Sequence, residues 1–280
     1  MYRIVQKKAL NPTVTQMDIL APMVAKKAEP GQFVILRVDA DGERIPLTIA
    51  DYDRELGIVT IIFQIVGATT QALDRLNAGD AISDFAGPLG RATHTDGLKK
   101  VAIVGGGVGC AIAYPVAKKL HSLGAEVHSI IGFRNSSLVI LEDAFRSASQ
   151  RLVLMSDDGS TGRKGLVTDA LKELIESGQR YDQVIAIGPL VMMKFVCALT
   201  KEYGIKTIVS MNPIMIDGTG MCGGCRLNVG GKTKFACVDG PDFDGHEVNF
   251  YEAISRSNAY WPFERAAHEA TCNLMKMEAK

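Results

Sequence analysis

The stretch KVAIVGGGVGCAIAYPVAKKLHSLGAEVHSIIGFR, residues 100–134, contains an apolar strand, a glycine-rich turn, a helix and a second apolar strand. Such alternation of strand and helix is typical of a doubly wound parallel sheet. Four glycines follow the first strand: Gly105, Gly106, Gly107 and Gly109. Glycine permits a tight turn and lets the backbone approach a ligand phosphate at the helix N-terminus. The stretch therefore predicts a nucleotide-binding α/β domain.

The glycine run does not complete the dinucleotide pattern G-x-G-x-x-G, because the last position counted from Gly105 is Cys110. We interpret Cys110 as a packing residue of the helix, since no His/Asp arrangement accompanies it. The second strand, residues 126–133, ends in Arg134 and not in an acid that would hold a ribose 2′-hydroxyl. An arginine suits a 2′-phosphate or a pyrophosphate, so this position does not decide between NADH and NADPH.

Two further strands, residues 152–155 and 183–187, are expected to end at the same edge of this sheet, and a helix is expected at residues 190–200. Ligands of doubly wound sheets bind outside the carboxyl ends of the strands. The candidate residues at these ends are Asp157, Asp158, Gly159, Gly188 and Pro189. A set of exposed loops is the alternative interpretation.

Residues 1–97 are expected to form short strands separated by turns. The strands are rich in β-branched and aromatic residues and occupy residues 4–5, 14–20, 33–38 and 57–66. Closely spaced strands of this kind predict an antiparallel barrel or sandwich. A helical turn is expected at residues 69–78.

Several residues of this N-terminal region offer donors to a phosphate. Arg44 lies close to a strand, and Gly67 precedes the expected helical turn, with Thr69 or Thr70 as its N-cap. Taken singly, each also fits a structural role, as a surface arginine or a helix cap.

A third region is marked by MIDGTGMCGGCRLNVGGKTKFACVDGPDF, residues 215–243, which holds three of the six cysteines. Plant-type 2Fe–2S ferredoxins use C-x4-C-x2-C and a distant fourth cysteine. Asp217, Cys222, Cys225 and Cys237 reproduce this spacing with a carboxylate in the first position. The neighbouring glycines let a loop wrap around an anionic cluster and direct N–H groups to its sulfurs. The spacing therefore favours an iron–sulfur site.

Two alternatives remain open for these residues. Zinc also binds three thiolates and a carboxylate, although zinc sites usually combine two C-x2-C pairs. Asp217 also fits a turn residue that caps Gly218 and Thr219. In that case Cys272 is the late cysteine available as a further ligand.

Composition argues against several functional classes. Lysine plus arginine and aspartate plus glutamate number 31 each, so no net charge draws the chain to nucleic acid or to an anionic membrane. The longest apolar stretch, residues 101–117, is too short and glycine-rich for a membrane span. The first ten residues lack the apolar core of a signal peptide. Cysteines at metal spacing indicate reduced thiols, and we expect a cytoplasmic protein.

Three segments of the N-terminal region together resemble the flavin domain of the ferredoxin–NADP reductase superfamily. They are PGQFV at residues 30–34, RIPLT at residues 44–48 and VGATTQAL at residues 66–73, followed by a matching GPLG turn at residues 87–90. The stretches DGSTGRKG, residues 158–165, and GPLVMM, residues 188–193, resemble elements of the superfamily's nicotinamide domain.

The resemblance implies Arg44 on the FAD pyrophosphate and Thr48 as the catalytic donor near flavin N5. Leu47 departs from the tyrosine that many members carry, so the aromatic face against the flavin is missing or supplied from elsewhere. The cofactor-binding residues implied, by the resemblance and by the strand ends, are Arg44, Pro46, Leu47, Thr48, Gln64, Gly67, Thr69, Thr70, Gly87, Gly105, Gly106, Gly107, Gly109, Arg134, Asp157, Asp158, Gly159, Gly188 and Pro189.

The order of the regions resembles the electron-transfer subunits of dihydroorotate dehydrogenase and, more closely, the small subunits of NADH-dependent ferredoxin:NADP oxidoreductases (Nfn). Aspartate in the first ligand position is typical of the Nfn type, whereas the dihydroorotate branch has four cysteines. The resemblance implies an electron-transfer flavoprotein with FAD, NAD(H) or NADP(H), and a 2Fe–2S cluster. The ligands implied for that cluster are Asp217, Cys222, Cys225 and Cys237.

A partner is expected because the sequence has no C-x2-C-x2-C-x3-C run of a 4Fe–4S protein. The resemblance implies a heterodimer with a larger flavoprotein subunit that carries 4Fe–4S clusters, an indirect link to ferredoxin, and electron bifurcation. An alternative of another class is a zinc-stapled nucleotide-binding regulator without redox turnover.

The expected fold is thus β plus α/β. Residues 1–97 form an antiparallel FAD-binding β-barrel, residues 98–210 a doubly wound parallel NAD(P)-binding domain, and residues 211–250 a small 2Fe–2S loop domain. Residues 251–280 form a tail with Tyr260 and Trp261, which contacts a partner or folds back as a cover.

Overall fold

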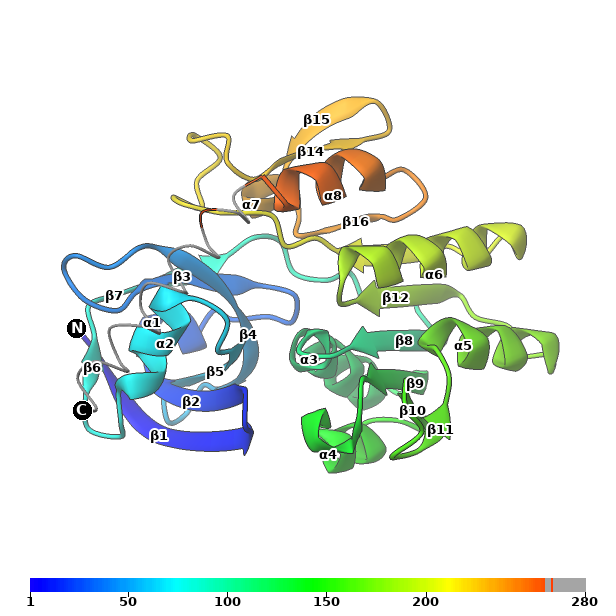
Figure 1. Cartoon of the computed structure of the whole chain (residues 1–280), viewed down its shortest axis with the longest axis horizontal. Coiled ribbons are helices and arrows are strands. Elements are labelled where there is room, and N and C mark those ends of the chain that lie inside the picture. Colours follow the sequence, from blue (N-terminus) through cyan, green and yellow to red (C-terminus); the bar gives the residue numbers. More distant parts are fainter. Residues whose placement is uncertain (260–262, 264–280) are drawn as a thin grey trace.

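The computed structural model describes residues 1–259 and residue 263, and Figure 1 shows that they form three parts. The N-terminal part, blue to cyan, is a sheet with strand order β6-β1-β2-β5-β4-β3-β7. All of its pairings are antiparallel. Its elements are β1 (Tyr2–Asn11), β2 (Val14–Leu20), α1 (Pro22–Ala25), β3 (Phe33–Arg37), β4 (Ile45–Asp53), β5 (Ile58–Gln64), α2 (Ala68–Arg75), β6 (Ala81–Ile82) and β7 (Asp84–Leu89). The sheet curls into a nearly closed barrel, which confirms the predicted antiparallel barrel.

Alternating burial along the barrel strands divides their side chains between two cores. Met17 and Ile19 of β2 point into the barrel's own core, because every second residue of a strand faces the same side. Val14, Ala50 and Ile62 belong to a core that the barrel shares with helix α3 (Gly109–Ser122) of the second part. The barrel is therefore packed against the α/β sheet by apolar side chains.

The second part is a sheet of order β11-β10-β9-β8-β12-β13-β16. Its strands are parallel except for the last, which pairs antiparallel with β13. Its elements are β8 (Lys100–Gly106), α3 (Gly109–Ser122), β9 (Glu126–Phe133), the short 3-10 helix η1 (Ser136–Leu138), α4 (Glu142–Ser147), β10 (Arg151–Ser156), β11 (Arg163–Lys164), α5 (Val167–Glu176), β12 (Gln183–Ile187), α6 (Leu190–Glu202), β13 (Thr207–Ser210) and β16 (Asp242–Asp244).

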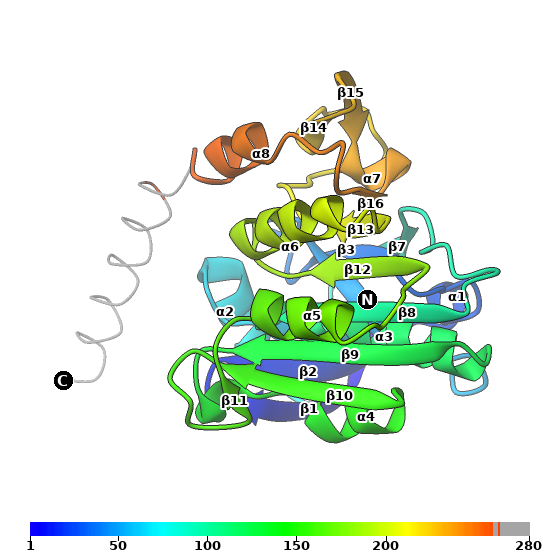
Figure 2. The ribbon, with the colours of Figure 1, turned by 90° about the vertical axis from the view of Figure 1, so that its right-hand side faces the viewer.

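Both faces of this sheet are covered, as the doubly wound prediction requires. Ala102 and Val104 of β8 pack with α5 and α6, whereas Val101 and Ile103 pack with α3 and α4. Figure 2 views the sheet with α5 in front of it and α3 behind it. The chain runs outward from β8 to β10 and then returns to β12, so the strand order reverses between β8 and β12.

The third part lies above the junction of the other two in Figure 1. It comprises the hairpin β14 (Arg226–Val229) and β15 (Lys232–Phe235), the short helix α7 (Ala236–Asp239) and helix α8 (Phe250–Ser257). Strand β16, which follows α7, extends the α/β sheet. The segment with the clustered cysteines is therefore tied to the sheet by backbone hydrogen bonds. Over the described part of the chain, no helix is both long and apolar enough to span a bilayer.

Candidate functional site

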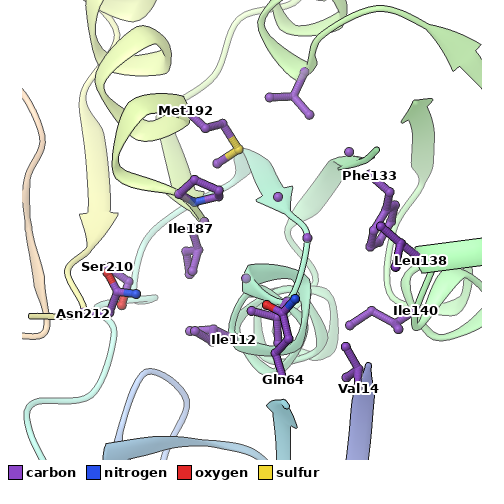
Figure 3. A pocket seen from close by; sticks show the side chains of 18 of the residues that line it. Val14, Gln64, Ile112, Phe133, Leu138, Ile140, Ile187, Met192, Ser210 and Asn212 are labelled. Carbon is purple, nitrogen blue, oxygen red and sulfur yellow. The ribbon is translucent and has the colours of Figure 1, made fainter. Parts of the chain in front are cut away.

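A cavity of about 1060 Å³ lies between the barrel and the carboxyl ends of the parallel strands. In Figure 3 the side chains of Val14 and Gln64 approach from the barrel below, and those of Ile187 and Met192 approach from the α/β part above. Single-ligand pockets commonly range from about 300 to 1,000 Å³. The cavity is therefore large enough for more than one small ligand or for extended dinucleotides.

The glycine turn forms one wall of the cavity at the point where the strand order reverses. Gly107 has a φ of +54°, which favours glycine. A Cβ on Gly109 would lie 2.5 Å from the Ile187 carbonyl oxygen and 2.7 Å from the Gly188 Cα. Only glycine lets the start of α3 approach the end of β12 this closely.

Cys110 follows this turn and is completely buried. A Cβ on Gly105 would lie 2.9 Å from the Cys110 sulfur, so the thiol fills the space against the end of β8. Burial raises the pKa of the Cys110 thiol far above its usual value. The interpretation of Cys110 as a packing residue is confirmed.

The ends of β9 and β10 form a second wall. The Asp157 N–H donates to the Phe133 carbonyl at 3.1 Å, and Arg134 and Asp157 both line the cavity. Asp158 does not line the cavity. Its carboxylate accepts two hydrogen bonds from Ser160, one from the N–H at 2.9 Å and one from the hydroxyl at 2.7 Å. These bonds hold the pKa of Asp158 below its usual range. The two neighbouring acids thus have different surroundings.

The barrel wall of the cavity includes Pro46, Leu47 and Thr48 of β4, and Gln64 at the end of β5. Phe33 lies opposite Thr48 in the pairing of β3 with β4 and also lines the cavity. An aromatic ring therefore borders the cavity on the neighbouring strand, although position 47 itself is leucine.

The start of α2 lies close to the start of β4. Helix α2 begins at Ala68 with Gly67 as N-cap, so the expectation that Thr69 or Thr70 caps it is wrong. The Thr70 hydroxyl accepts the N–H of Gly67 at 3.0 Å, and the Thr69 hydroxyl donates to Glu43 at 3.4 Å. Since Glu43 directly precedes the exposed Arg44, the arginine is brought near the helix start.

The cavity brings together most of the residues singled out from the sequence. Those that line it are Pro46, Leu47, Thr48, Gln64, Thr70, Gly106, Gly107, Gly109, Arg134, Asp157, Gly188 and Pro189. The remaining candidates, all within the described residues, lie outside its lining: Arg44, Gly67, Thr69, Gly87, Gly105, Asp158 and Gly159. Sequence reasoning missed Ser210, Met211 and Asn212 at the end of β13. The same strand-end rule would have found them.

The clustered cysteines lie in the third part of the molecule. The Cys225 and Cys237 sulfurs are 3.2 Å apart and buried, whereas Cys222 is exposed. Burial, followed by the neighbouring Cys225, raises the pKa of the Cys237 thiol to about 12. Across the residues described here, no three or more potential ligands lie close enough together to hold one metal ion. The structure thus pairs two of the four predicted ligands.

Asp217 is bonded to its own loop. Its carboxylate accepts the N–H groups of Thr219 and Cys222, each at 2.9 Å. These bonds, that of Thr219 foremost, hold the pKa of Asp217 below its usual range. This is the capping arrangement considered as the alternative from sequence. Because one of the two donors is Cys222, the carboxylate still lies in the loop that carries the first cysteine.

The donor set nevertheless fits an iron–sulfur cluster in its chemistry. Backbone N–H groups point at two of the sulfurs, from Gly224 to Cys222 and from Cys237 to Cys225, each at 3.5 Å. Such hydrogen bonds stabilise negative charge on cluster sulfurs. A Cβ on Gly218 would lie 2.7 Å from Leu89 Cδ1 and 2.8 Å from Ile35 Cδ1. The loop is therefore in direct contact with the barrel.

Of the tail, Phe263 is exposed. Tyr260, Trp261 and the alternative ligand Cys272 lie outside the described residues. The expectations for the tail and for Cys272 stay predictions.

Comparison with known proteins gives a consistent family. A family model described as the iron–sulfur cluster binding domain of dihydroorotate dehydrogenase B matches residues 212–249. A Thermotoga maritima protein described as a homolog of the dihydroorotate dehydrogenase B (NAD(+)) electron transfer subunit is 44% identical over 266 residues, 95% of this chain and 94% of the relative. The electron transfer subunit of dihydroorotate dehydrogenase B from Fusobacterium nucleatum is 34% identical, over 83% of this chain and 92% of the relative.

Solved structures support the same family. A chain of the NADH-dependent reduced ferredoxin-NADP oxidoreductase, from work on flavin-based electron bifurcation, superposes with a TM-score of 0.92 at 41% identity, covering 97% of this chain and 98% of that chain. The cytochrome b5 reductase domain of Ulva prolifera nitrate reductase, at 16% identity and a TM-score of 0.60, covers 73% of this chain and 92% of that chain, and shows the fold alone. The family that these relatives form consists of NAD(P)H-dependent flavin and iron–sulfur oxidoreductase subunits, with a dihydroorotate dehydrogenase B branch and an Nfn branch. The chain therefore belongs to this family, within the ferredoxin–NADP reductase superfamily.

Proposed function

We propose that this chain is the small subunit of an electron-bifurcating, Nfn-type NADH-dependent ferredoxin:NADP oxidoreductase, with FAD and a 2Fe–2S cluster. One observation carries the proposal: barrel strands and the glycine turn share one cavity, and the cysteine-bearing loop packs on the same barrel at Leu89 and Ile35. A flavin accepts electrons in pairs from a nicotinamide and releases them singly, which is the chemistry FAD would supply there.

The barrel residues would bind and orient the flavin. Pro46, Leu47 and Thr48 border the cavity along one strand, and the Thr48 hydroxyl is the group we assign to hold a hydrogen bond at N5. Arg44 and the start of α2 would bind the FAD phosphates, since a guanidinium and helix N–H groups both favour anions. The apolar side chains of Val14, Ile62 and other lining residues exclude water.

The α/β part would bind NAD(H) or NADP(H). The N-terminus of α3 faces the cavity through Gly107 and Gly109, which suits a pyrophosphate. Arg134 and Asp157 lie at the adjacent strand ends, where the adenosine ribose is expected. Gly188 and Pro189 close the wall at the end of β12.

The iron–sulfur site would be held by Cys222, Cys225, Cys237 and Asp217. Metal binding deprotonates coordinating thiols, so a cluster would offset the burial that raises the pKa of Cys237. The carboxylate of Asp217 accepts one N–H at each oxygen, from Thr219 and from Cys222, so each oxygen keeps a lone pair with which it could bind iron.

A larger partner subunit is part of the proposal. The chain has no 4Fe–4S motif of its own, so electrons that leave its single cluster need an acceptor elsewhere. Ile214, Ile216 and Met221, around the cysteine loop, are 44%, 52% and 87% exposed. Exposed apolar groups beside an electron exit favour a protein contact. We place the partner's 4Fe–4S clusters, and ferredoxin beyond them, on this side, in the cytoplasm.

A second candidate is the electron-transfer subunit of a dihydroorotate dehydrogenase. It is favoured by the family model that matches residues 212–249 and by the relatives so described. The aspartate at position 217 favours the Nfn type, because the dihydroorotate branch has cysteine there.

The proposal is tested on the complex purified anaerobically with its native partner. We expect FAD, a 2Fe–2S absorption spectrum and a flavoprotein partner with 4Fe–4S clusters, identified by mass. Zinc in place of iron, or a colourless protein, would contradict it. A dihydroorotate-oxidising partner would establish the second candidate.

Replacement of Asp217 separates its two roles. If it ligates iron, Asp217→Cys keeps the cluster with a shifted absorption spectrum, and Asp217→Ala lowers iron content by about tenfold or more. Asp217→Asn preserves an acceptor for the Thr219 N–H and serves as the control for the cap. Iron content and the absorption spectrum after anaerobic purification show whether Asp217 binds iron or only caps its loop. An unchanged cluster in Asp217→Ala would remove Asp217 from the ligand set.

A further inference from the structure

Asp242 occupies an unusual place for a carboxylate. It lies on β16, and its Oδ2 accepts the Thr93 hydroxyl at 2.6 Å. Its other oxygen, Oδ1, is buried and has no hydrogen-bond partner among the described residues. Burial raises the pKa of Asp242. A buried carboxyl with an unpaired oxygen is costly, so its presence requires a reason.

Thr93, the first partner of Asp242, is fixed to the barrel. Its N–H donates to the Pro30 carbonyl at 2.9 Å, and its side chain packs directly against Gly31. In the same connecting segment, the Gly90 carbonyl accepts the side-chain amide of Gln32 at 2.9 Å. The segment from Gly90 to Thr93 is thus held against the turn that precedes β3.

The same connecting segment also holds the cysteine-bearing part. The Arg91 N–H donates to the Gly240 carbonyl at 2.7 Å, and its guanidinium donates to the Val238 carbonyl at 3.0 Å. Val238 directly follows Cys237 in α7. The position of Cys237 therefore depends on a segment that is itself fastened to the barrel.

The third contact runs to the α/β sheet. Asp242 lies opposite Ser210 in the pairing of β16 with β13, and the Met211 N–H donates to the Pro241 carbonyl at 2.9 Å. Ser210, Met211 and Pro241 line the cavity, and Figure 3 shows Ser210 at its edge. Asp242 thus joins the barrel connection, through its carboxylate, to the sheet, through its strand pairing, next to the cysteine segment.

We propose that Asp242 is a positioning residue, which fixes the segment of Cys237 relative to the barrel and so sets the distance for electron transfer between flavin and cluster. This inference rests on the proposed function. In the proposed function, the hydride of NAD(P)H would bring two electrons to the flavin. The flavin would release them singly to the cluster, and the cluster would pass the first electron to the partner's clusters before it accepts the second. Tunnelling rates fall steeply with distance, so this second step depends on the junction and hydride transfer does not.

The test is anaerobic stopped-flow reduction of the holo-complex by NADH or NADPH, recorded separately at flavin and cluster wavelengths. In Asp242→Ala we expect flavin reduction close to the rate of the unmodified complex and cluster reduction slowed several-fold, because tunnelling slows as the distance between flavin and cluster grows. Asp242→Asn keeps an acceptor for Thr93 and should restore the rate. Thr93→Val removes the hydroxyl that donates to Asp242 and should slow cluster reduction in the same way. This variant keeps the test possible if Asp242→Ala proves unstable.

Asp244→Ala is the matched control on the same strand, because its carboxylate accepts the N–H of His246 at 3.0 Å within its own turn. Both phases should stay unchanged in this variant. The inference is overturned if Asp242→Ala and Thr93→Val reduce the cluster at the unmodified rate, or if both phases slow equally. Absence of any cluster phase in the unmodified complex would instead remove the proposed function.

Discussion

Replacing Cys225 by serine is expected to remove the iron–sulfur cluster and to leave the flavin bound. Cys225 is buried and its sulfur lies 3.2 Å from that of Cys237, so the two thiols form the most enclosed part of the proposed ligand set. A hydroxyl is a poor replacement for a thiolate at iron. We expect iron content to fall by about tenfold or more, and NAD(P)H-dependent reduction of the partner to fall with it.

Iron and flavin analysis, followed by NAD(P)H oxidation with a two-electron acceptor, checks this prediction. The two-electron reaction should persist, because it needs only the cavity. Cys197→Ser is the matched control, since Cys197 is also a buried cysteine but lies in α6. Full iron in Cys225→Ser, or equal loss in Cys197→Ser, would show that the paired thiols do not hold the cluster.

Replacing Gly109 by alanine is expected to abolish most nicotinamide binding. The added Cβ would lie 2.5 Å from a backbone oxygen and 2.7 Å from a backbone carbon of β12 and its following turn, and neither can move independently. The start of α3 must therefore shift away from the cavity. We expect kcat/KM for NAD(P)H to fall by about 100-fold, as for other displacements of a binding group by about 1 Å.

Steady-state kinetics and flavin content measure this effect. Gly124→Ala, just beyond the other end of α3, is the control: its φ is +84°, and a Cβ there would meet no atom within 4 Å. It should cost about 1 kcal/mol or somewhat more of stability and leave kcat/KM unchanged. If Gly109→Ala retains the unmodified kcat/KM with full flavin, the glycine turn is not the nicotinamide site.

The α/β sheet and its binding edge could be predicted because their signals are local. Gly105 to Gly109 follow an apolar strand directly, and the reversal of strand order then places Gly188 opposite them. The start of α2 was harder to predict from the sequence, because threonines such as Thr69 and Thr70 are common N-cap residues and compete with Gly67 for that position. Gly67 is the N-cap because the Thr70 hydroxyl accepts the N–H of Gly67, which places Thr70 inside the first turn of the helix.

The cysteine region shows where sequence reasoning ends. Spacing identified Cys225 and Cys237, which the structure pairs across a hairpin. Spacing could not show that Asp217 bonds to the backbone of its own loop, because a turn and a ligand require the same residue there. Asp242 had no local signal at all, since its partner Thr93 is 149 positions away in sequence.

In the proposed function, one chain passes electrons from a nicotinamide through a flavin to an iron–sulfur cluster. Anaerobic addition of NADH or NADPH to the iron-replete complex, followed by absorption and by low-temperature electron paramagnetic resonance, tests it most directly. We expect bleaching of the flavin together with the signal of a reduced 2Fe–2S cluster, and we expect that signal to be missing in Cys225→Ser. Flavin bleaching without that signal, or the same signal in Cys225→Ser, would contradict it.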